Sequence, residues 1–146
     1  PHDRGQEAQE AVEARAKSVR DQGAFSTFDA ALERWFTIRY LENSDGSDLV
    51  RSWRGQVDAE SYAQTAWVLA HGVRELIAPE PAVVAPSLVL TCENDSGSTP
   101  EMSHAIAAEI DGAETIIIPQ LQHLGLMEDP GAFTKPILDF LQRTTS

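Results

Sequence analysis

The sequence predicts an α/β protein made of two unlike parts. Residues 1–78 contain no segment typical of a strand, whereas residues 87–146 read as strand, helix, strand, helix. The join, residues 79–86, carries three prolines, which remove backbone donors and favour extended backbone. We therefore expect a helical part at 1–78, a proline-rich connector at 79–86 and an α/β part at 87–146.

Composition narrows the class of protein. The 146 residues are 42% hydrophobic, enough for one ordinary core. A net charge of −12 disfavours binding to the phosphates of nucleic acid. The single cysteine, Cys92, rules out an intrachain disulfide and cannot carry a metal cluster. No apolar run is long enough to span a membrane and no secretion signal is visible, so we expect a cytoplasmic chain that binds neither membrane nor nucleic acid.

The first half has the residue pattern of a small helical layer. Asp3 followed by Gln6 resembles a capping box that opens a helix rich in good helix formers. Later segments space their apolar residues three and four apart, which is typical of amphipathic helices. Helices are expected at residues 6–20, 26–40, 47–55 and 59–77.

The second half predicts a parallel sheet. Residues 87–92 and 113–119 are short apolar runs typical of strands buried on both faces. A helix from Pro100 to Gly112 connects them, and Pro130 opens a last helix. The apolar residues expected to face inward from that last helix are Phe133, Ile137, Phe140 and Leu141.

Two parallel strands cannot cover themselves. Such a pair exposes two edges, and parallel sheets occur buried among several strands. We therefore expect these strands to be the C-terminal part of a larger sheet, whose N-terminal strands are absent from this chain.

Two polar residues follow the two strands. Asp95 comes after the first strand and His123 after the second, so parallel pairing would bring them together. A carboxylate bonded to one imidazole nitrogen fixes the tautomer and leaves the other nitrogen as a general base. Glu93, at the same strand end, is the alternative orienting acid. The structural alternative is that Asp95 caps a turn and His123 packs at the surface.

Residues 86–141 closely resemble the C-terminal third of α/β-hydrolases. In that family a strand ends in Gly-x-x-Asp, a Pro-led helix and a strand follow, and a Pro-Gly-x-Gly-His turn precedes a Glu-x-Pro helix start. The resemblance implies that Asp95 is the triad acid and His123 the triad base. The helical half, especially "ALERWFT" at 31–37, resembles the cap of enzymes similar to 3-oxoadipate enol-lactonases and related esterases.

The chain departs from the family pattern at several positions. Cys92 stands where the family has glycine, and Gln120 and Gln122 replace small residues of the histidine turn. The nucleophile elbow Gly-x-Ser-x-Gly is absent from the sequence. Ser96 and Ser98 precede a helix start and are expected to serve turn and capping roles. The resemblance thus implies a cap plus the acid and base end of a hydrolase.

The resemblance also suggests substrate contacts. Trp35 and Phe36 of the cap and Leu124 beside His123 are candidates, although apolar helix faces are more often core. The apolar neighbours of His123, including Leu126, are expected to exclude water around it. The remaining histidines are expected to be structural or solvated, and Glu128 to be a charge favourable to a helix start.

Two functions compete. The first is a serine hydrolase acting on a small ester or lactone without metal or organic cofactor, in which this chain supplies Asp95 and His123. The Ser nucleophile and the oxyanion hole would then come from a missing N-terminal portion or a second subunit that completes the sheet. The second is a non-catalytic, truncated hydrolase-like binding or scaffold protein, favoured by the missing nucleophile.

Overall fold

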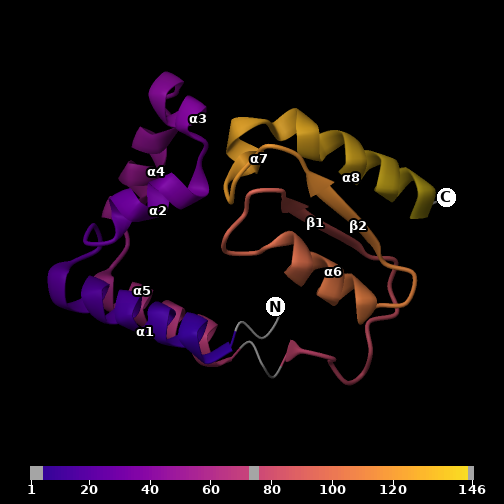
Figure 1. Ribbon diagram of the computed structural model, residues 1–146, viewed down its shortest axis with the longest axis horizontal. Coiled ribbons are helices and arrows are strands. Elements are labelled where there is room, and N and C mark those ends of the chain that lie inside the picture. The colour runs from indigo at the N-terminus through magenta and orange to yellow at the C-terminus, as the bar shows by residue number, and fades with distance from the viewer. Residues whose placement is uncertain (1–4, 73–75, 145–146) are drawn as a thin grey trace. The chain divides into compact units, whose positions relative to one another are not determined.

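The computed structural model describes residues 5–72 and 76–144 and divides into two compact units. Unit 1 comprises Pro1–Glu33 and Asn43–Ile77, and unit 2 comprises Arg34–Glu42 and Ala78–Ser146. Figure 1 shows helices alone in the first part of the chain and two strands with flanking helices in the second. The short segment Arg34–Glu42, which lies inside the expected helical half, belongs to unit 2.

Unit 1 is built on two helices packed side by side, α1 (Gly5–Gln22) and α5 (Ala59–His71). Small and branched side chains fill the space between them, which lets the two backbones approach closely. These core residues are Val12, Ala16, Ala63, Ala66 and Ala70. The helix α4 (Gly46–Gly55) and most of α2 (Phe28–Trp35) complete the unit.

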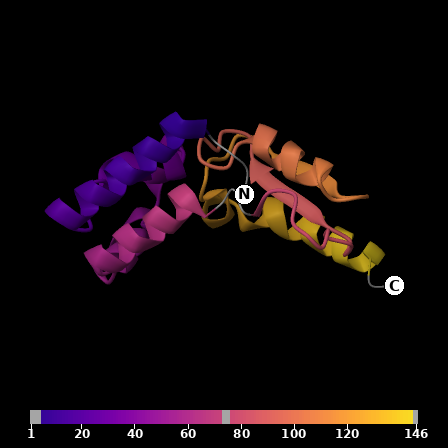
Figure 2. The same cartoon turned by 90° about the horizontal axis from the view of Figure 1, so that it is seen from below.

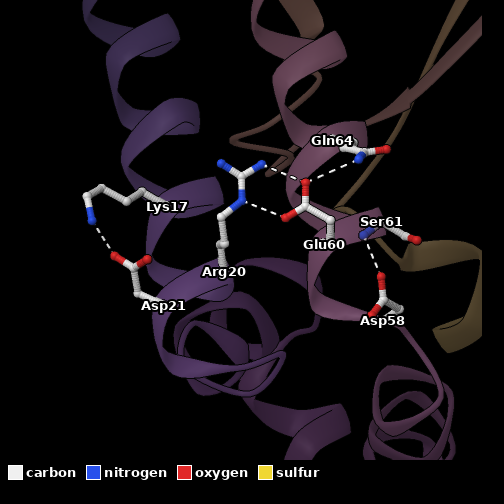
Figure 3. Close-up of polar contacts among 7 residues, drawn as sticks. All are labelled: Lys17, Arg20, Asp21, Asp58, Glu60, Ser61 and Gln64. Carbon is white, nitrogen blue, oxygen red and sulfur yellow. Dashed lines mark hydrogen bonds and ion pairs between the residues drawn. The ribbon is translucent and has the colours of Figure 1, made fainter.

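Polar contacts link α1 and α5 on their solvent-facing side (Figure 3). Arg20 pairs with both carboxylate oxygens of Glu60, at 2.7 and 3.0 Å. Asp58 begins α5 by accepting a hydrogen bond from the backbone of Ser61, which satisfies a free N–H of the first turn. Hydrogen bonds from the backbone and then from the side chain of Ser61 lower the pKa of the Asp58 carboxyl. The expected opening cap of α1 at Asp3 lies outside the described residues.

The helix expected at 26–40 is broken in two. Helix α2 ends at Trp35 and α3 (Ile38–Asn43) begins after Thr37. The Trp35 carbonyl accepts from the backbone of Leu124, and Thr37 begins α3 by accepting from Tyr40. Tertiary hydrogen bonds thus replace the helical ones at this junction, which periodicity alone does not reveal. The helix expected at 59–77 likewise ends early, at His71.

Unit 2 contains a parallel pair of strands, as the sequence predicted. Strand β1 (Leu88–Cys92) pairs with β2 (Glu114–Ile118), in a register that joins Leu88 to Glu114 and Cys92 to Ile118. The crossover helix α6 (Pro100–Ala108) begins where Thr99 accepts from the backbone of Met102. Helix α8 (Pro130–Thr144) lies on the opposite face of the strands from α6 (Figure 2). A four-residue helix, α7 (Gly125–Glu128), was not expected.

The strands and α8 are less buried than expected. Leu88, Val89 and Leu90 are only partly buried, whereas the sequence predicted a strand buried on both faces. On α8, Phe133 and Phe140 are partly buried, but Ile137 and Leu141 are 37% and 45% exposed, so these two are not buried as their inward-facing pattern predicted. The physical reason is that no further strand or helix among the described residues covers these surfaces. None of the described helices has the length and apolar character needed to cross a bilayer.

Candidate active site

Asp95 is buried in the turn that follows β1. Its exposed fraction is 6%, and its Oδ1 accepts hydrogen bonds from the backbone of Gly97 at 2.7 Å and of Ser98 at 2.8 Å. The second carboxylate oxygen therefore points away from the turn. Backbone donors that hold one oxygen of a carboxylate fix its orientation.

The free oxygen of Asp95 meets His123. The distance from Asp95 Oδ2 to His123 Nδ1 is 2.8 Å. A carboxylate accepts, so Nδ1 is the donor in this bond, and the tautomer that fits this contact has its lone pair on Nε2. Among the described residues no hydrogen bond reaches Nε2, and the His123 side chain is 39% exposed. Nε2 therefore has no hydrogen-bond partner among the described residues, on a ring that is partly open to solvent.

The turns that carry the pair are joined directly. The backbone N–H of Glu93 donates to the Ile118 carbonyl at 2.8 Å, and that of Asn94 donates to the Leu121 carbonyl at 3.0 Å. The Glu93 carboxylate accepts from the backbone of Gln120 at 2.8 Å. Glu93, the alternative orienting acid, is thus engaged in holding the histidine turn, and Asp95 is the acid that contacts His123.

Gly97 covers the pair from one side. A Cβ placed on this residue would lie 3.3 Å from Asp95 Oδ1 and 3.7 Å from His123 Nδ1. The first distance is tight and the second is ordinary van der Waals contact, so a side chain here would crowd the Asp95 carboxylate.

Comparison with known proteins identifies the fold of the chain. No family model matches the chain. The chain is similar to the solved enol-lactonase of Burkholderia xenovorans LB400, with a TM-score of 0.82 and 30% identity, over 91% of this chain and 50% of that one. It is also similar to a thermophilic esterase of Thermogutta terrifontis, with a TM-score of 0.79 and 26% identity, over 97% of this chain and 52% of that one.

A relative found by sequence comparison is also a hydrolase, and the chain again matches about half of it. The (E)-2-((N-methylformamido)methylene)succinate hydrolase of Acinetobacter baylyi is 27% identical over 137 residues, which are 94% of this chain and 51% of that protein. This chain has the fold of the C-terminal part of an α/β-hydrolase. It spans about half the length of the relatives that it matches.

Two departures from the α/β-hydrolase pattern have a structural explanation. Gln120 has a backbone φ of 63°, the left-handed conformation that glycine adopts most readily, so it occupies a glycine-like position with a side chain. Cys92 packs with its Sγ against Gly125. Burial, with a further contribution from the nearby Asp95 charge, raises the pKa of the Cys92 thiol to about 11, which makes it a poor nucleophile.

The substrate candidates differ in their surroundings. Phe36 is 1% exposed and stacks on Tyr40 with ring centroids 4.8 Å apart, which favours a packing role. Trp35 and Leu124 are partly buried, and the Leu124 N–H donates to the Trp35 carbonyl at 2.8 Å. Leu126, on α7, is 56% exposed, so the expected apolar enclosure of His123 is incomplete in the described residues.

Glu128 has a role that sequence reasoning missed. It lies at the end of α7, and its two oxygens accept from the Thr37 backbone at 2.8 Å and from the Thr37 hydroxyl at 2.6 Å. Glu128 is the acidic residue in the first turn of α7, as expected, and it also binds a residue distant in sequence. The Glu-x-Pro motif drew attention to Glu128, but no sequence pattern predicted that Thr37 would be its hydrogen-bond partner.

The other sequence candidates lie outside this cluster. His71 belongs to unit 1, where it stacks on Trp67, and His104 is exposed on α6. Ser98 serves the Asp95 turn, as above, and Ser96 is exposed. Among residues 5–72 and 76–144, no group of three or more His, Cys, Asp or Glu side chains is placed to hold a metal ion.

Proposed function

We propose that this chain supplies the acid and the base of a Ser-His-Asp hydrolase that acts on a small ester or lactone. The observation that carries the proposal is the 2.8 Å bond between Asp95 Oδ2 and His123 Nδ1, made by two turns at the ends of parallel strands. Similarity to an enol-lactonase and an esterase, at 30% and 26% identity, supports the reaction class.

In the proposed mechanism His123 first accepts a proton and then donates it. Its Nε2 takes the proton of a serine hydroxyl while the serine oxygen attacks the substrate carbonyl carbon. The imidazolium, stabilised by Asp95, then gives that proton to the leaving oxygen as the ester or lactone C–O bond breaks. Water repeats the cycle on the acyl-enzyme and releases the acid, so no metal or organic cofactor is needed.

The serine must come from outside these 146 residues. No Gly-x-Ser-x-Gly segment occurs in the sequence, and the chain matches only about half of its relatives. We propose that an N-terminal portion or a second subunit supplies the nucleophile, the oxyanion hole and the remaining strands. Residues 1–78 are proposed to serve as the cap, with Trp35 and Leu124 as substrate contacts.

The test is hydrolysis of short p-nitrophenyl esters and of a simple lactone by the complete native assembly. We expect turnover that is lost in His123→Ala and kept in His104→Ala, a matched change at an exposed histidine. An inert assembly, or a His123→Ala variant with normal turnover, would rule out the proposal. Inert material would favour the scaffold function, for which the missing nucleophile motif is the supporting observation.

A further inference from the structure

The contact between Thr37 and Glu128 joins two parts of unit 2 that are far apart in sequence. Thr37 donates from its backbone to Glu128 Oε1 at 2.8 Å and from its hydroxyl to Oε2 at 2.6 Å. Both oxygens of one carboxylate are thus held by one residue, which restricts rotation of the Glu128 side chain. Hydrogen bonds to a charged acceptor are stronger than neutral ones.

This contact stabilises the segment directly after His123. Helix α7 has only four residues, too few to be stable without tertiary support. The segment is held at its start by the Leu124 N–H, which donates to the Trp35 carbonyl at 2.8 Å, and at its end by Glu128. Residues 35–37 therefore fix both ends of the stretch that follows His123.

The stretch before His123 is held differently. Asn94 and Glu93, in the turn after β1, bind the backbone of Leu121 and Gln120 respectively. These bonds fix the chain as far as Leu121. The ring of His123 is itself 39% exposed, so packing does little to orient it. Its geometry on Asp95 therefore depends on anchors on both sides of it.

We propose that Thr37 and Glu128 are positioning residues for His123. Their paired hydrogen bonds hold α7 and Leu124 against residues 35–37, and this keeps the imidazole Nδ1–H on Asp95 and directs Nε2 outward. The inference rests on the proposed function, in which the Asp95-bound ring is the general base. Neither residue is assigned a contact with the substrate, and both act through the backbone on the C-terminal side of His123.

The test measures the ring directly and does not require activity. In the 146-residue chain labelled with ¹⁵N-histidine, the exchange rate of the His123 Nδ1 proton with water is measured by NMR, with His123→Gln used for assignment. Because a lost hydrogen bond to a charged group corresponds to a factor of ten or more, Glu128→Ala is expected to speed exchange roughly tenfold. Thr37→Val keeps the backbone donor and should fall between Glu128→Ala and the parent chain.

Two variants separate positioning from general loss of stability. Glu128→Gln keeps an oxygen for the Thr37 backbone and should restore exchange close to the parent rate. Thr134→Val removes an exposed α8 hydroxyl that bonds the Pro130 carbonyl, and should change nothing. A folded Glu128→Ala variant whose exchange rate stays within about twofold of the parent rate would overturn the proposal. If Glu128→Ala does not fold, an unchanged rate in Thr37→Val overturns it instead.

Failure of this inference differs from failure of the proposed function. An assembly that hydrolyses no ester or lactone, but in which Glu128→Ala loosens the ring, would remove the catalytic role and leave the positioning role. An active assembly in which the ring is unaffected by Glu128→Ala would remove only the positioning role.

Discussion

Gly125 packs directly on Cys92, so that a Cβ placed on Gly125 would lie 2.7 Å from the cysteine Sγ. It would also lie 2.8 Å from the Cβ of Leu121. Real Cβ atoms do not approach other atoms so closely, and neither neighbour is the far end of a flexible side chain. The absence of a side chain at this position therefore lets α7 begin against the end of β1.

Gly125→Ala should destabilise unit 2. The added methyl must displace Cys92 or Leu121, and overpacking of this kind costs about 1–3 kcal/mol of the free energy of unfolding. Urea denaturation measures the change. Gly55→Ala is the matched control, because a Cβ there meets only the tip of Phe25 at an ordinary 3.5 Å. Equal stability of the two variants would contradict the close packing at Gly125.

Cys92 should react slowly with iodoacetamide, with a pH profile shifted to high pH. Burial and then the Asp95 charge raise the pKa of this thiol from 9.0 to about 11. The thiolate is the reactive form, so the alkylation rate of the folded chain should keep rising beyond pH 9, about tenfold per unit. In urea the same chain should level off near the ordinary pKa. Coincident folded and unfolded profiles would refute the raised pKa.

The same shift affects stability at alkaline pH. A thiol whose pKa is raised by folding favours the folded state below the unfolded pKa of 9.0, and this contribution is lost as pH rises toward about 11. The stability of the parent chain should therefore fall more steeply over this interval than that of Cys92→Ala. Parallel curves from urea melts at successive pH values would count against the assignment.

Gln120→Gly should stabilise the histidine turn. Gln120 is exposed and has a φ of 63°, a conformation that costs a residue with a Cβ about 1 kcal/mol. Glycine removes this cost, Asn reduces it, and Ala keeps it, so thermal melts should rank the variants Gly, then Asn, then Ala close to the parent. A Gln120→Ala variant as stable as Gln120→Gly would show that the turn is not strained.

Alone, the chain should associate through the apolar surface of α8. Ile137, Leu138 and Leu141 are 37%, 50% and 45% exposed, and β1 and β2 pair only with each other among the described residues. Sedimentation velocity should show concentration-dependent association that weakens in Leu141→Lys, without a fall in melting temperature. A monomeric, cooperatively folding chain at all concentrations would contradict the expectation that further strands complete this sheet.

The features that depend on local residue patterns were predicted correctly from the sequence. The apolar runs of β1 and β2 and the Thr99-Pro100 helix start were enough to place parallel strands, and the strand ends then brought Asp95 and His123 together. Each of these features depends on neighbouring residues or on the general geometry of a parallel pair. These features could therefore be predicted from the sequence alone.

Other features depend on contacts between distant residues. Periodicity continues through Thr37, but hydrogen bonds to Leu124 and Glu128 break the helix there. The exposure of Ile137 was mispredicted for a related reason. Its apolar character predicts burial, yet the described residues provide nothing to cover it. Such outcomes depend on which partners are present, and a residue pattern does not specify them.

The most direct measurement is a double-mutant cycle on kcat in the complete assembly, using His123→Ala, Asp95→Asn and the pair. Because Asp95 acts through His123, each single change should lower kcat by roughly 10⁴-fold or more, with little change in melting temperature. The double variant should be scarcely slower than His123→Ala alone. Losses that multiply, or an Asp95→Asn variant with near-normal kcat, would contradict the assignment of Asp95 and His123 as a coupled catalytic pair.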